Sequence, residues 1–429
     1  MKGLTGASQL LRNAAVAVLL AGVLPTSPTL AQDVLIRGAE VHTLTSAGKL
    51  TNADVLISGG KIAAVGQAVN APSNAVVIDA KGRPLTPGLF GGLNSIGVEE
   101  VSAERSTVDE GLRLDAPMYQ TQWRPEFDVT LAYNPRSVLL PVARMDGLTW
   151  TVLAPSGGDA LLAGQGAAIT LDGSYDAVLE GSRSLFVSIG SDALEMSAGS
   201  RAGQYMLLDQ AVRETRTPPP AGTPTLLLPA GREVLAKFLK GGRVVFRVHR
   251  AADIRQVLSL AKRYGVKPVI VGGEEAWLVA EDLAKAKVPV LLNPFENLPG
   301  DFDRIGARLD NAALLAQAGV TISFIQGNDA SHNARKIRQG AGNAVAHGLP
   351  WDAALAALTS VPAEIFGLER RGRIAPGFAA DVVLWSADPL EVTSVAEQVW
   401  IAGSPVTMRS RQGELRDRYM ERLRRKAAR

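Results

Sequence analysis

The second half of the chain alternates short apolar runs with stretches of helical spacing. The runs lie at 244–248, 268–271, 288–292 and 320–324, and the helical stretches follow at 253–264, 275–284, 311–318 and 333–347. A buried apolar run followed by an amphipathic stretch is typical of a parallel βα unit. Four such units in series predict an α/β barrel, with a doubly wound open sheet as the alternative.

Both ends of the chain carry a different pattern, of short strands and tight turns. The strand-like runs lie at 33–37, 55–58, 61–65, 75–78, 382–385 and 398–401. Gly59-Gly60 predicts a hairpin turn, because glycine adopts the positive φ that such turns need. Neither end alone has enough strands to bury both faces of a sheet. We therefore expect residues 32–83 and 369–429 to form one discontinuous β-sandwich, with residues 84–368 as an inserted TIM-type barrel.

The first 31 residues have the pattern of an export signal. Lys2 and Arg12 precede the apolar run 14–24, and Thr29-Leu30-Ala31 offers a small-residue cleavage site. A membrane anchor is the alternative, but the run is about half the length that spans a bilayer. We expect a mature chain that begins near Gln32, has no membrane span, and is periplasmic or secreted.

Charge and composition exclude several classes of protein. The formal net charge is +3 and falls to +1 without Lys2 and Arg12, which is too small to indicate a nucleic-acid partner. The chain has no cysteine, so any metal site must use His, Asp, Glu or a modified Lys. The basic segment 411–429, with Leu415, Tyr419 and Leu423 on one side, predicts a helix that packs on its own domain.

Three segments of the mature chain carry motifs of a known family. They are 34–41 together with 57–65, then Leu-Thr-Pro-Gly-Leu at 85–89, then 353–381. In these segments the chain resembles the amidohydrolase superfamily, in particular the branch of imidazolonepropionase and metal-dependent dipeptidases. The resemblance implies a (β/α)8 barrel with a composite β-sandwich. It also implies a hydrolase that acts on C–N bonds, non-peptide or dipeptide-type, of a small molecule.

The chain departs from this family where metal ligands are expected. In the family a His-x-His pair follows the Pro-Gly-Leu segment, since alternate residues at a strand end point to the same side. Leu93 and Ser95 occupy those two positions here, and leucine cannot bind a metal while a neutral hydroxyl binds it poorly. The sixth strand ends in Gly-Gly at 272–273, so its histidine is lost unless Glu274 or Glu275 turns inward.

The remaining ligands that the resemblance implies are few. His249 matches the fifth-strand histidine, and Asp329 matches the eighth-strand aspartate that binds metal and moves the proton. With His332 nearby, these residues predict at most one divalent metal, with zinc favoured and no metal as the alternative. Glu99 or Glu100 would have to complete the site, although the acidic residues at 99, 100 and 104 are more typical of a solvated loop. His42 and His347 are expected to be structural.

Three arginines, Arg247, Arg250 and Arg335, lie around the same predicted loops. Each can bind a substrate carboxylate through paired hydrogen bonds, although surface ion pairs are the more common role. The glycine-rich run 157–166 lacks the Lys-Ser/Thr ending of a phosphate loop, which disfavours nucleotide binding. Two functions remain open: an exported amidohydrolase-type hydrolase with a degenerate metal site, and a non-catalytic binding protein or partner subunit of an intact paralogue. Either could form a homo-oligomer.

Overall fold

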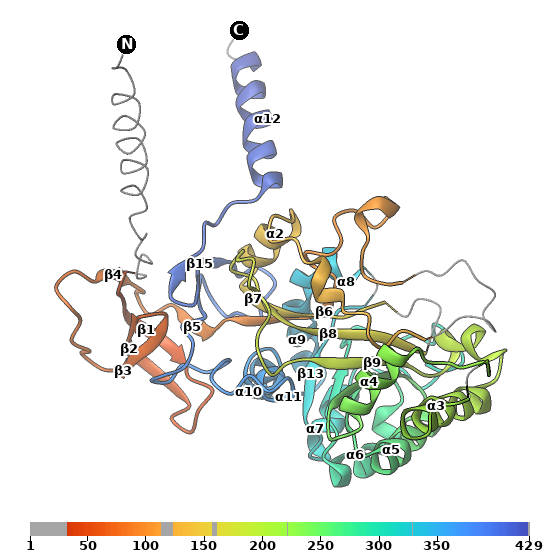
Figure 1. Ribbon diagram of the computed structural model, residues 1–429. Coiled ribbons are helices and arrows are strands. Elements are labelled where there is room, and N and C mark those ends of the chain that lie inside the picture. The colour runs from red at the N-terminus through yellow and green to blue at the C-terminus, as the bar shows by residue number, and fades with distance from the viewer. Residues whose placement is uncertain (1–31, 113–122, 157–160, 221, 328, 428–429) are drawn as a thin grey trace, which may run out of the picture.

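Two β-sheets and a layer of helices make up the molecule (Figure 1). The computed structural model describes residues 32–112, 123–156, 161–220, 222–327 and 329–427. The predicted export segment 1–31 lies outside the described residues, as do Gly157 and Gly158.

The first sheet is built from both ends of the chain. Its strands are β1 (Val34–His42), β2 (Lys49–Ser58), β3 (Lys61–Gly66), β4 (Val76–Asp79), β5 (Pro84–Pro87), β14 (Val382–Trp385), β15 (Ala396–Ile401) and β16 (Ser404–Pro405). β14 joins the two ends because it pairs antiparallel with β5. The sequence had placed residues 84–87 at the start of the barrel, whereas their ladders with β1 and β14 put them in this sheet.

The second sheet is a nearly closed barrel of eight strands. Its strands, which neighbour one another in chain order, are β6 (Leu89–Asn94), β7 (Leu148–Leu153), β8 (Leu162–Thr170), β9 (Ser184–Ser188), β10 (Arg243–Val248), β11 (Lys267–Gly272), β12 (Val290–Leu292) and β13 (Ile322–Phe324). A doubly wound sheet would reverse this order at a switch point. The predicted TIM-type barrel is therefore confirmed, and the two chain ends, expected to form a β-sandwich, form one extra sheet.

One strand of the barrel runs the wrong way for a regular βα repeat. β8 is antiparallel to both β7 and β9, while the other pairs along the sheet are parallel. Only eight residues, 154–161, connect the end of β7 to the start of β8. Gly166 allows the close approach, since a Cβ there would collide with the Leu153 carbonyl and lie 3.0 Å from the Phe186 ring.

Helices cover the outside of the barrel and extend beyond it. The α-helices are α2 (Leu139–Met145), α3 (Arg201–Arg216), α4 (Pro229–Phe238), α5 (Ala251–Tyr264), α6 (Ala280–Ala286), α7 (Asn311–Gln317), α8 (Ala330–Asn333), α9 (Ile337–Ala346), α10 (Trp351–Ala357), α11 (Ser360–Ile365) and α12 (Arg411–Ala427). Short 3-10 turns are η1 (Arg105–Thr107), η3 (Val129–Ala132), η4 (Ser191–Ala193), η5 (Glu195–Ser197), η6 (Ala276–Val279) and η7 (Ala334–Lys336).

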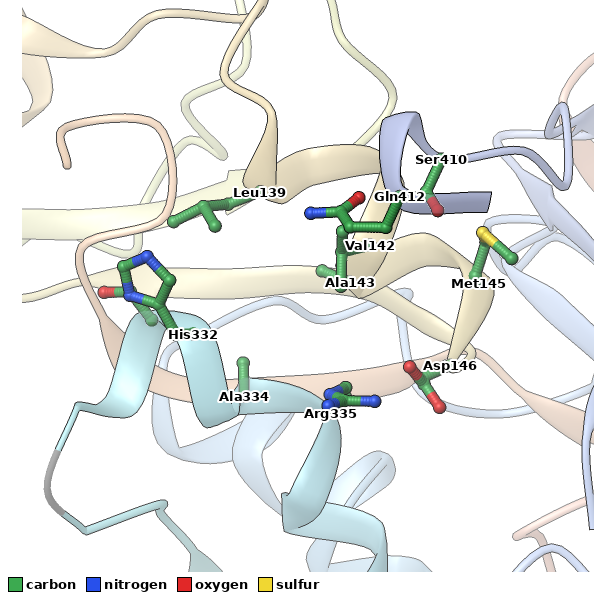
Figure 2. A pocket seen from close by; sticks show the side chains of 11 residues that line it. Leu139, Val142, Ala143, Met145, Asp146, His332, Ala334, Arg335, Ser410 and Gln412 are labelled. Carbon is green, nitrogen blue, oxygen red and sulfur yellow. The ribbon is translucent and has the colours of Figure 1, made fainter. Parts of the chain in front are cut away.

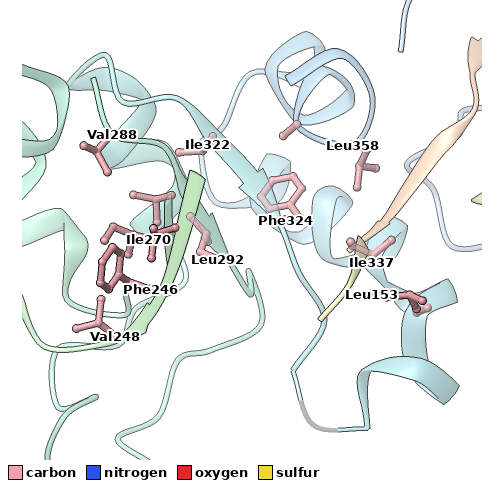
Figure 3. Packing of buried hydrophobic residues seen from close by; sticks show 14 of the residues in the cluster. Leu153, Phe246, Val248, Ile270, Val288, Leu292, Ile322, Phe324, Ile337 and Leu358 are labelled. Atoms are coloured by element: carbon pink, nitrogen blue, oxygen red, sulfur yellow. The ribbon is translucent and has the colours of Figure 1, made fainter. Parts of the chain in front are cut away.

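Alternation along β10 sets the direction of the side chains that matter for function. Phe246 and Val248 point outward into the apolar layer between strands and helices (Figure 3). Val245 points inward, to the apolar cluster that fills the barrel. Because successive residues of a strand face opposite sides, Arg247 also points inward. His249, just beyond the strand, lies at the mouth of the barrel above this core.

The barrel is closed by side chains at one seam. Among the described residues, no ladder of backbone hydrogen bonds joins β6 to β13. The Ser95 backbone N–H donates to the Ser331 hydroxyl across the seam, at 2.9 Å. Gly92 packs there so closely that a Cβ would lie 3.2 Å from the Ile337 side chain.

The C-terminal helix contradicts one expectation. α12 contains no buried side chain, and it projects away from the body of the molecule (Figure 1). The prediction that it packs on its own domain is wrong. Within the described part of the chain, no helix is both long and apolar enough to cross a membrane.

Candidate functional site

A polar cavity of about 730 Å³ opens at the mouth of the barrel, beyond the carboxyl ends of its parallel strands. Its lining includes acidic, basic and small polar side chains that follow β6, β9, β10, β11 and β13. The mouth formed by these ends is where α/β barrels carry their active sites.

Three side chains in and beside this cavity form a group of metal-ligand type. One ligand atom each from Glu99, Asp329 and His332 lies within 4.8 Å of the other two. Glu99 follows β6, whereas Asp329 and His332 follow β13, so the group spans the seam of the barrel. Two of the three ligands predicted from the sequence, Asp329 and His332, are thus brought together.

Glu99 is buried, with 7% of its surface exposed, so the expectation of a solvated acidic loop is wrong for this residue. Burial raises the pKa of its carboxyl group, and the neighbouring Glu110 raises it further. A hydrogen bond from the Ser331 hydroxyl opposes this rise. A carboxyl group in such a place favours either a proton or a nearby cation.

Asp329 and His332 hold each other in place. His332 Nδ1 lies 2.9 Å from Asp329 Oδ1, and His332 Nε2 lies 3.2 Å from the Glu100 carbonyl oxygen. Asp329 adopts a left-handed φ of 54°, a conformation that Asp and Asn tolerate better than most residues. His332 also lines a second pocket, of about 350 Å³, together with Leu139 and Arg335 (Figure 2).

His249 belongs to a different cluster on the opposite wall. Its Nδ1 contacts Glu274 in a very short hydrogen bond, and its Nε2 lies 3.3 Å from Asp192 and 3.0 Å from Arg304. Burial alone would lower the pKa of His249, but the bonds to Asp192 and Glu274 outweigh it and raise the pKa to about 9. His249 is therefore held in this second cluster and is not part of the group formed by Glu99, Asp329 and His332.

The two positions that lack imidazoles have taken other roles. Leu93 packs in the apolar cluster that fills the barrel and forms part of the cavity wall. The Ser95 hydroxyl donates a very short hydrogen bond to Glu110. Glu274 does turn inward, to His249, while Glu275 accepts from the Ala251 backbone N–H at 3.0 Å.

The three candidate arginines are placed very differently. Arg247 lines the cavity, and no ion pair of the described residues involves it. Arg250 is bound by Asp253, at 3.0 and 3.1 Å. Arg335 lies on the second pocket with Asp146, outside the barrel mouth (Figure 2). Of these three arginines, only Arg247 lines the cavity that holds Glu99 and Asp329.

The other two histidines are engaged in packing. His42 is buried against Trp351, with ring centroids 4.7 Å apart, and contacts Glu40. His347 ends α9 and lies 2.8 Å from the Asn343 carbonyl oxygen.

Sequence reasoning missed Glu110, Asp192 and Arg304, which all line the cavity. Glu110 lies sixteen residues beyond the end of β6, in an irregular loop, and Asp192 follows a strand that the sequence pattern did not resolve. Arg304 comes from the long loop after β12, where no periodic pattern gives a direction for its side chain. The only signal for these residues is that each lies in a loop on the carboxyl side of a strand.

An α/β barrel with a polar cavity at its mouth and a sheet from both chain ends defines a class of barrel enzymes. Comparison with known proteins points to one family. The model of an amidohydrolase family matches residues 229–407, which are less than half of the chain. This match and the structural neighbours confirm the resemblance to the amidohydrolase superfamily.

Individual relatives agree with this assignment. A crystal structure of an amidohydrolase from Thermotoga maritima superposes with a TM-score of 0.77 at 25% identity, covering 88% of this chain and 100% of that one. A prolidase crystallised with N-methylphosphonate-L-proline shares the fold, with a TM-score of 0.52 at 18% identity and coverage of 88% and 100%. Amidohydrolase tasK from Hapsidospora irregularis is 39% identical over 92 residues, which are 21% of this chain and 9% of that protein.

Proposed function

We propose that the chain is an exported hydrolase of a C–N bond, non-peptide or dipeptide-type, in a small molecule that carries a carboxylate. One divalent metal, with zinc favoured, would be held by Glu99, Asp329 and His332. The observation that carries the proposal is the convergence of these three ligand atoms within 4.8 Å at the barrel mouth.

The donor set fits a divalent cation. Two carboxylates and an imidazole are ligands that zinc takes, and catalytic zinc typically has three protein ligands and a water. The buried Glu99 carboxylate is costly without a counter-charge, and a cation beside it would remove that cost. When bound, such a metal polarises a substrate carbonyl and lowers the pKa of a bound water to about 7.

The protein's own groups then divide the remaining work. Ser331 donates to Glu99 and so fixes the orientation of its carboxylate. Asp329 has 47% of its side chain exposed, so it is accessible to a water and to a leaving nitrogen. We assign to it the proton transfer from the water to that nitrogen, the role of a general base and then a general acid.

Arg247 supports the choice of a carboxylate-bearing substrate. The Arg247 side chain is exposed to the cavity that it lines, and the surrounding protein lowers the pKa of its guanidinium even though Asp192 and Glu110 oppose this. A guanidinium without an ion-pair partner in such a place gains most from a planar anion that accepts two parallel hydrogen bonds.

Two measurements test the proposal together. Protein expressed in metal-supplemented medium should contain about one equivalent of metal by elemental analysis and should hydrolyse members of a panel of N-acyl amino acids and dipeptides. Asp329→Asn keeps a residue that tolerates the left-handed backbone, so it should abolish hydrolysis in a folded protein. Absence of zinc, manganese and iron together, or full activity of Asp329→Asn, would remove the catalytic mechanism.

Arg247 variants test the substrate class separately. Arg247→Gln should raise KM for carboxylate substrates by about 100-fold, while Arg247→Lys, which keeps the charge but not the fork of donors, should be intermediate. Equal losses on substrates with and without a carboxylate would contradict this role.

A non-catalytic binding protein is the second candidate function. It is favoured by the engagement of both His249 nitrogens with Glu274, Asp192 and Arg304. Among the described residues, the only group of three metal-ligand side chains is that of Glu99, Asp329 and His332. In that case carboxylates would raise the melting temperature in an Arg247-dependent way although the protein holds no metal.

Mass measurement of the mature chain from the periplasm tests export, with Gln32 as the expected first residue.

A further inference from the structure

α12 is a helix that the other described residues leave uncovered. It spans seventeen residues without a buried side chain, a length of about 25 Å. Ser410 and Gln412, at its root, line the second pocket beside α2 and η7 (Figure 2). From this root the helix extends away from the barrel (Figure 1).

The side chains of α12 are sorted by chemistry around its axis. Leu415, Tyr419 and Leu423 are four residues apart and therefore follow one face. Tyr419 and Leu423 are 53% and 60% exposed, and Met420, beside this face, is 46% exposed. Glu414, Asp417 and Glu421 lie on the side roughly opposite, at 100° per residue.

Basic side chains border the apolar face. By the same geometry Arg416, Arg422 and Lys426 lie within or beside it. The guanidinium carbons of Arg418 and Arg422 are 5.5 and 5.8 Å from the centre of the Tyr419 ring. An aromatic ring among arginines, with apolar residues beside it and acids turned away, is typical of a helix that lies in a membrane interface.

The charge of the molecule is concentrated in this helix. α12 has seven basic and three acidic side chains, hence a net charge of +4, while the whole chain has +3. The remainder of the chain is therefore close to neutral. We propose that α12 docks on the surface of an anionic lipid bilayer, with Leu415, Tyr419 and Leu423 among the acyl chains and its basic side chains at the headgroups.

A second copy of the chain fits the helix less well as an occupant. A coiled coil needs apolar residues that repeat every seven positions over at least three heptads. The residues seven positions after Leu415 and Tyr419 are Arg422 and Lys426. The apolar spacing therefore favours a flat surface over a partner helix. This inference does not depend on the proposed hydrolase activity.

Sedimentation with lipid vesicles tests the proposal on the full mature chain. We expect binding to phosphatidylcholine vesicles that contain phosphatidylglycerol, at least about tenfold weaker binding to pure phosphatidylcholine, and release at about 0.5 M salt, where screening is strong. The variant Leu415→Gln/Tyr419→Gln/Leu423→Gln should bind anionic vesicles at least about tenfold more weakly. Because α12 has no buried side chain, the circular dichroism spectrum and melting temperature of the barrel should not change.

A matched variant on the opposite face separates lipid docking from other partners. Glu414→Gln/Asp417→Asn/Glu421→Gln raises the net charge and keeps the apolar face, so it should bind anionic vesicles more tightly. Equal binding of the wild type and the apolar-face variant would overturn the proposal. The proposal would also fail if the wild type were a dimer and the apolar-face variant a monomer. It would fail too if the wild type bound duplex DNA more tightly than anionic vesicles.

Discussion

Glu99 connects stability and ligand binding in a single side chain. The raised pKa of this buried carboxyl group means that the folded, metal-free protein holds the proton more tightly than the unfolded chain. Stability therefore falls as pH rises from the ordinary pKa of a glutamate to the raised value, and the loss is complete above it. At neutral pH the metal-free protein is less stable than it would be with a neutral side chain.

Glu99→Gln should act in opposite directions on these two properties. Without metal, we expect the melting temperature to rise by about 1–3 °C at neutral pH, because the ionised group is gone. Metal affinity should fall by about 100-fold or more, because a ligand is lost. Calorimetry with and without zinc measures both, and a variant that binds zinc as tightly as the wild type would exclude Glu99 from the site.

His249 also makes the stability of the protein depend on pH, but through a protonated imidazole that is stabilising. Its folded-state pKa of about 9 exceeds the ordinary value, so the ionised cluster stabilises the protein fully below the unfolded pKa. That contribution is lost as pH rises through about 9. Urea denaturation should show His249→Gln to be less stable than the wild type near neutral pH, with the difference shrinking in alkaline solution.

His42 provides the matched control for this measurement. Burial lowers the pKa of His42, although Glu40 opposes this, so its stabilising contribution is lost as the solution becomes acidic. His42→Gln should therefore leave the alkaline slope of stability unchanged. A wild-type slope that persists in His249→Gln would contradict the role given to the cluster.

Part of the candidate site could be predicted from single positions in the sequence. The absent imidazoles at Leu93 and Ser95 and the pairing of Asp329 with His332 are readable because they lie at fixed distances from strand ends. The engagement of His249 is not readable, since Arg304 comes from a loop fifty-five residues away and Asp192 from another fifty-seven residues away. Side chains from irregular loops leave no periodic trace.

At the scale of elements, β8 is the main departure from the predicted repeat. Its apolar character indicates a strand, but the direction of a strand is not encoded in its own pattern. The direction follows from the short loop after β7 and from the close backbone contact at Gly166. The regular βα units of the second half were predictable because their long connections require parallel neighbours.

Gly166→Ala should therefore destabilise the barrel. A methyl group there collides with the Leu153 carbonyl, a backbone atom that cannot move alone, so we expect a loss of about 2 kcal/mol or more. Gly66→Ala is the control, since it has open space around it and no positive φ. Chemical denaturation compares the two, and similar midpoints for both variants would contradict the packing argument.

At the scale of the whole molecule, the candidate metal ligands lie on both sides of the seam between β6 and β13, which no backbone ladder joins among the described residues. A ligand held there connects the first strand of the barrel to the last. Because binding only to the folded state stabilises it by mass action, a metal at 100 times its dissociation constant should add about 2.7 kcal/mol.

Zinc should also slow amide hydrogen exchange selectively, in β6 and β13 more than in β10 and β11. Mass spectrometry of exchange with and without zinc measures this, with Asp329→Asn as the variant that should show no effect. Protection spread evenly over all eight strands would argue against closure at the seam.

The ladder between β5 and β14 has a further consequence for this seam. β5 leads directly into β6, the first strand of the barrel, and β14 follows the helices that come after β13, the last one. The pairing of β5 with β14 therefore connects the two edge strands of the barrel through the first sheet. Gly88 N–H to the Asp381 carbonyl, at 2.7 Å, and Trp385 to Thr86, at 2.9 Å, tighten it. A chain shortened to end before β14 keeps every barrel strand but loses this connection between the edge strands. The sheet made from the two chain ends therefore contributes to the stability of the barrel and cannot be removed without loss.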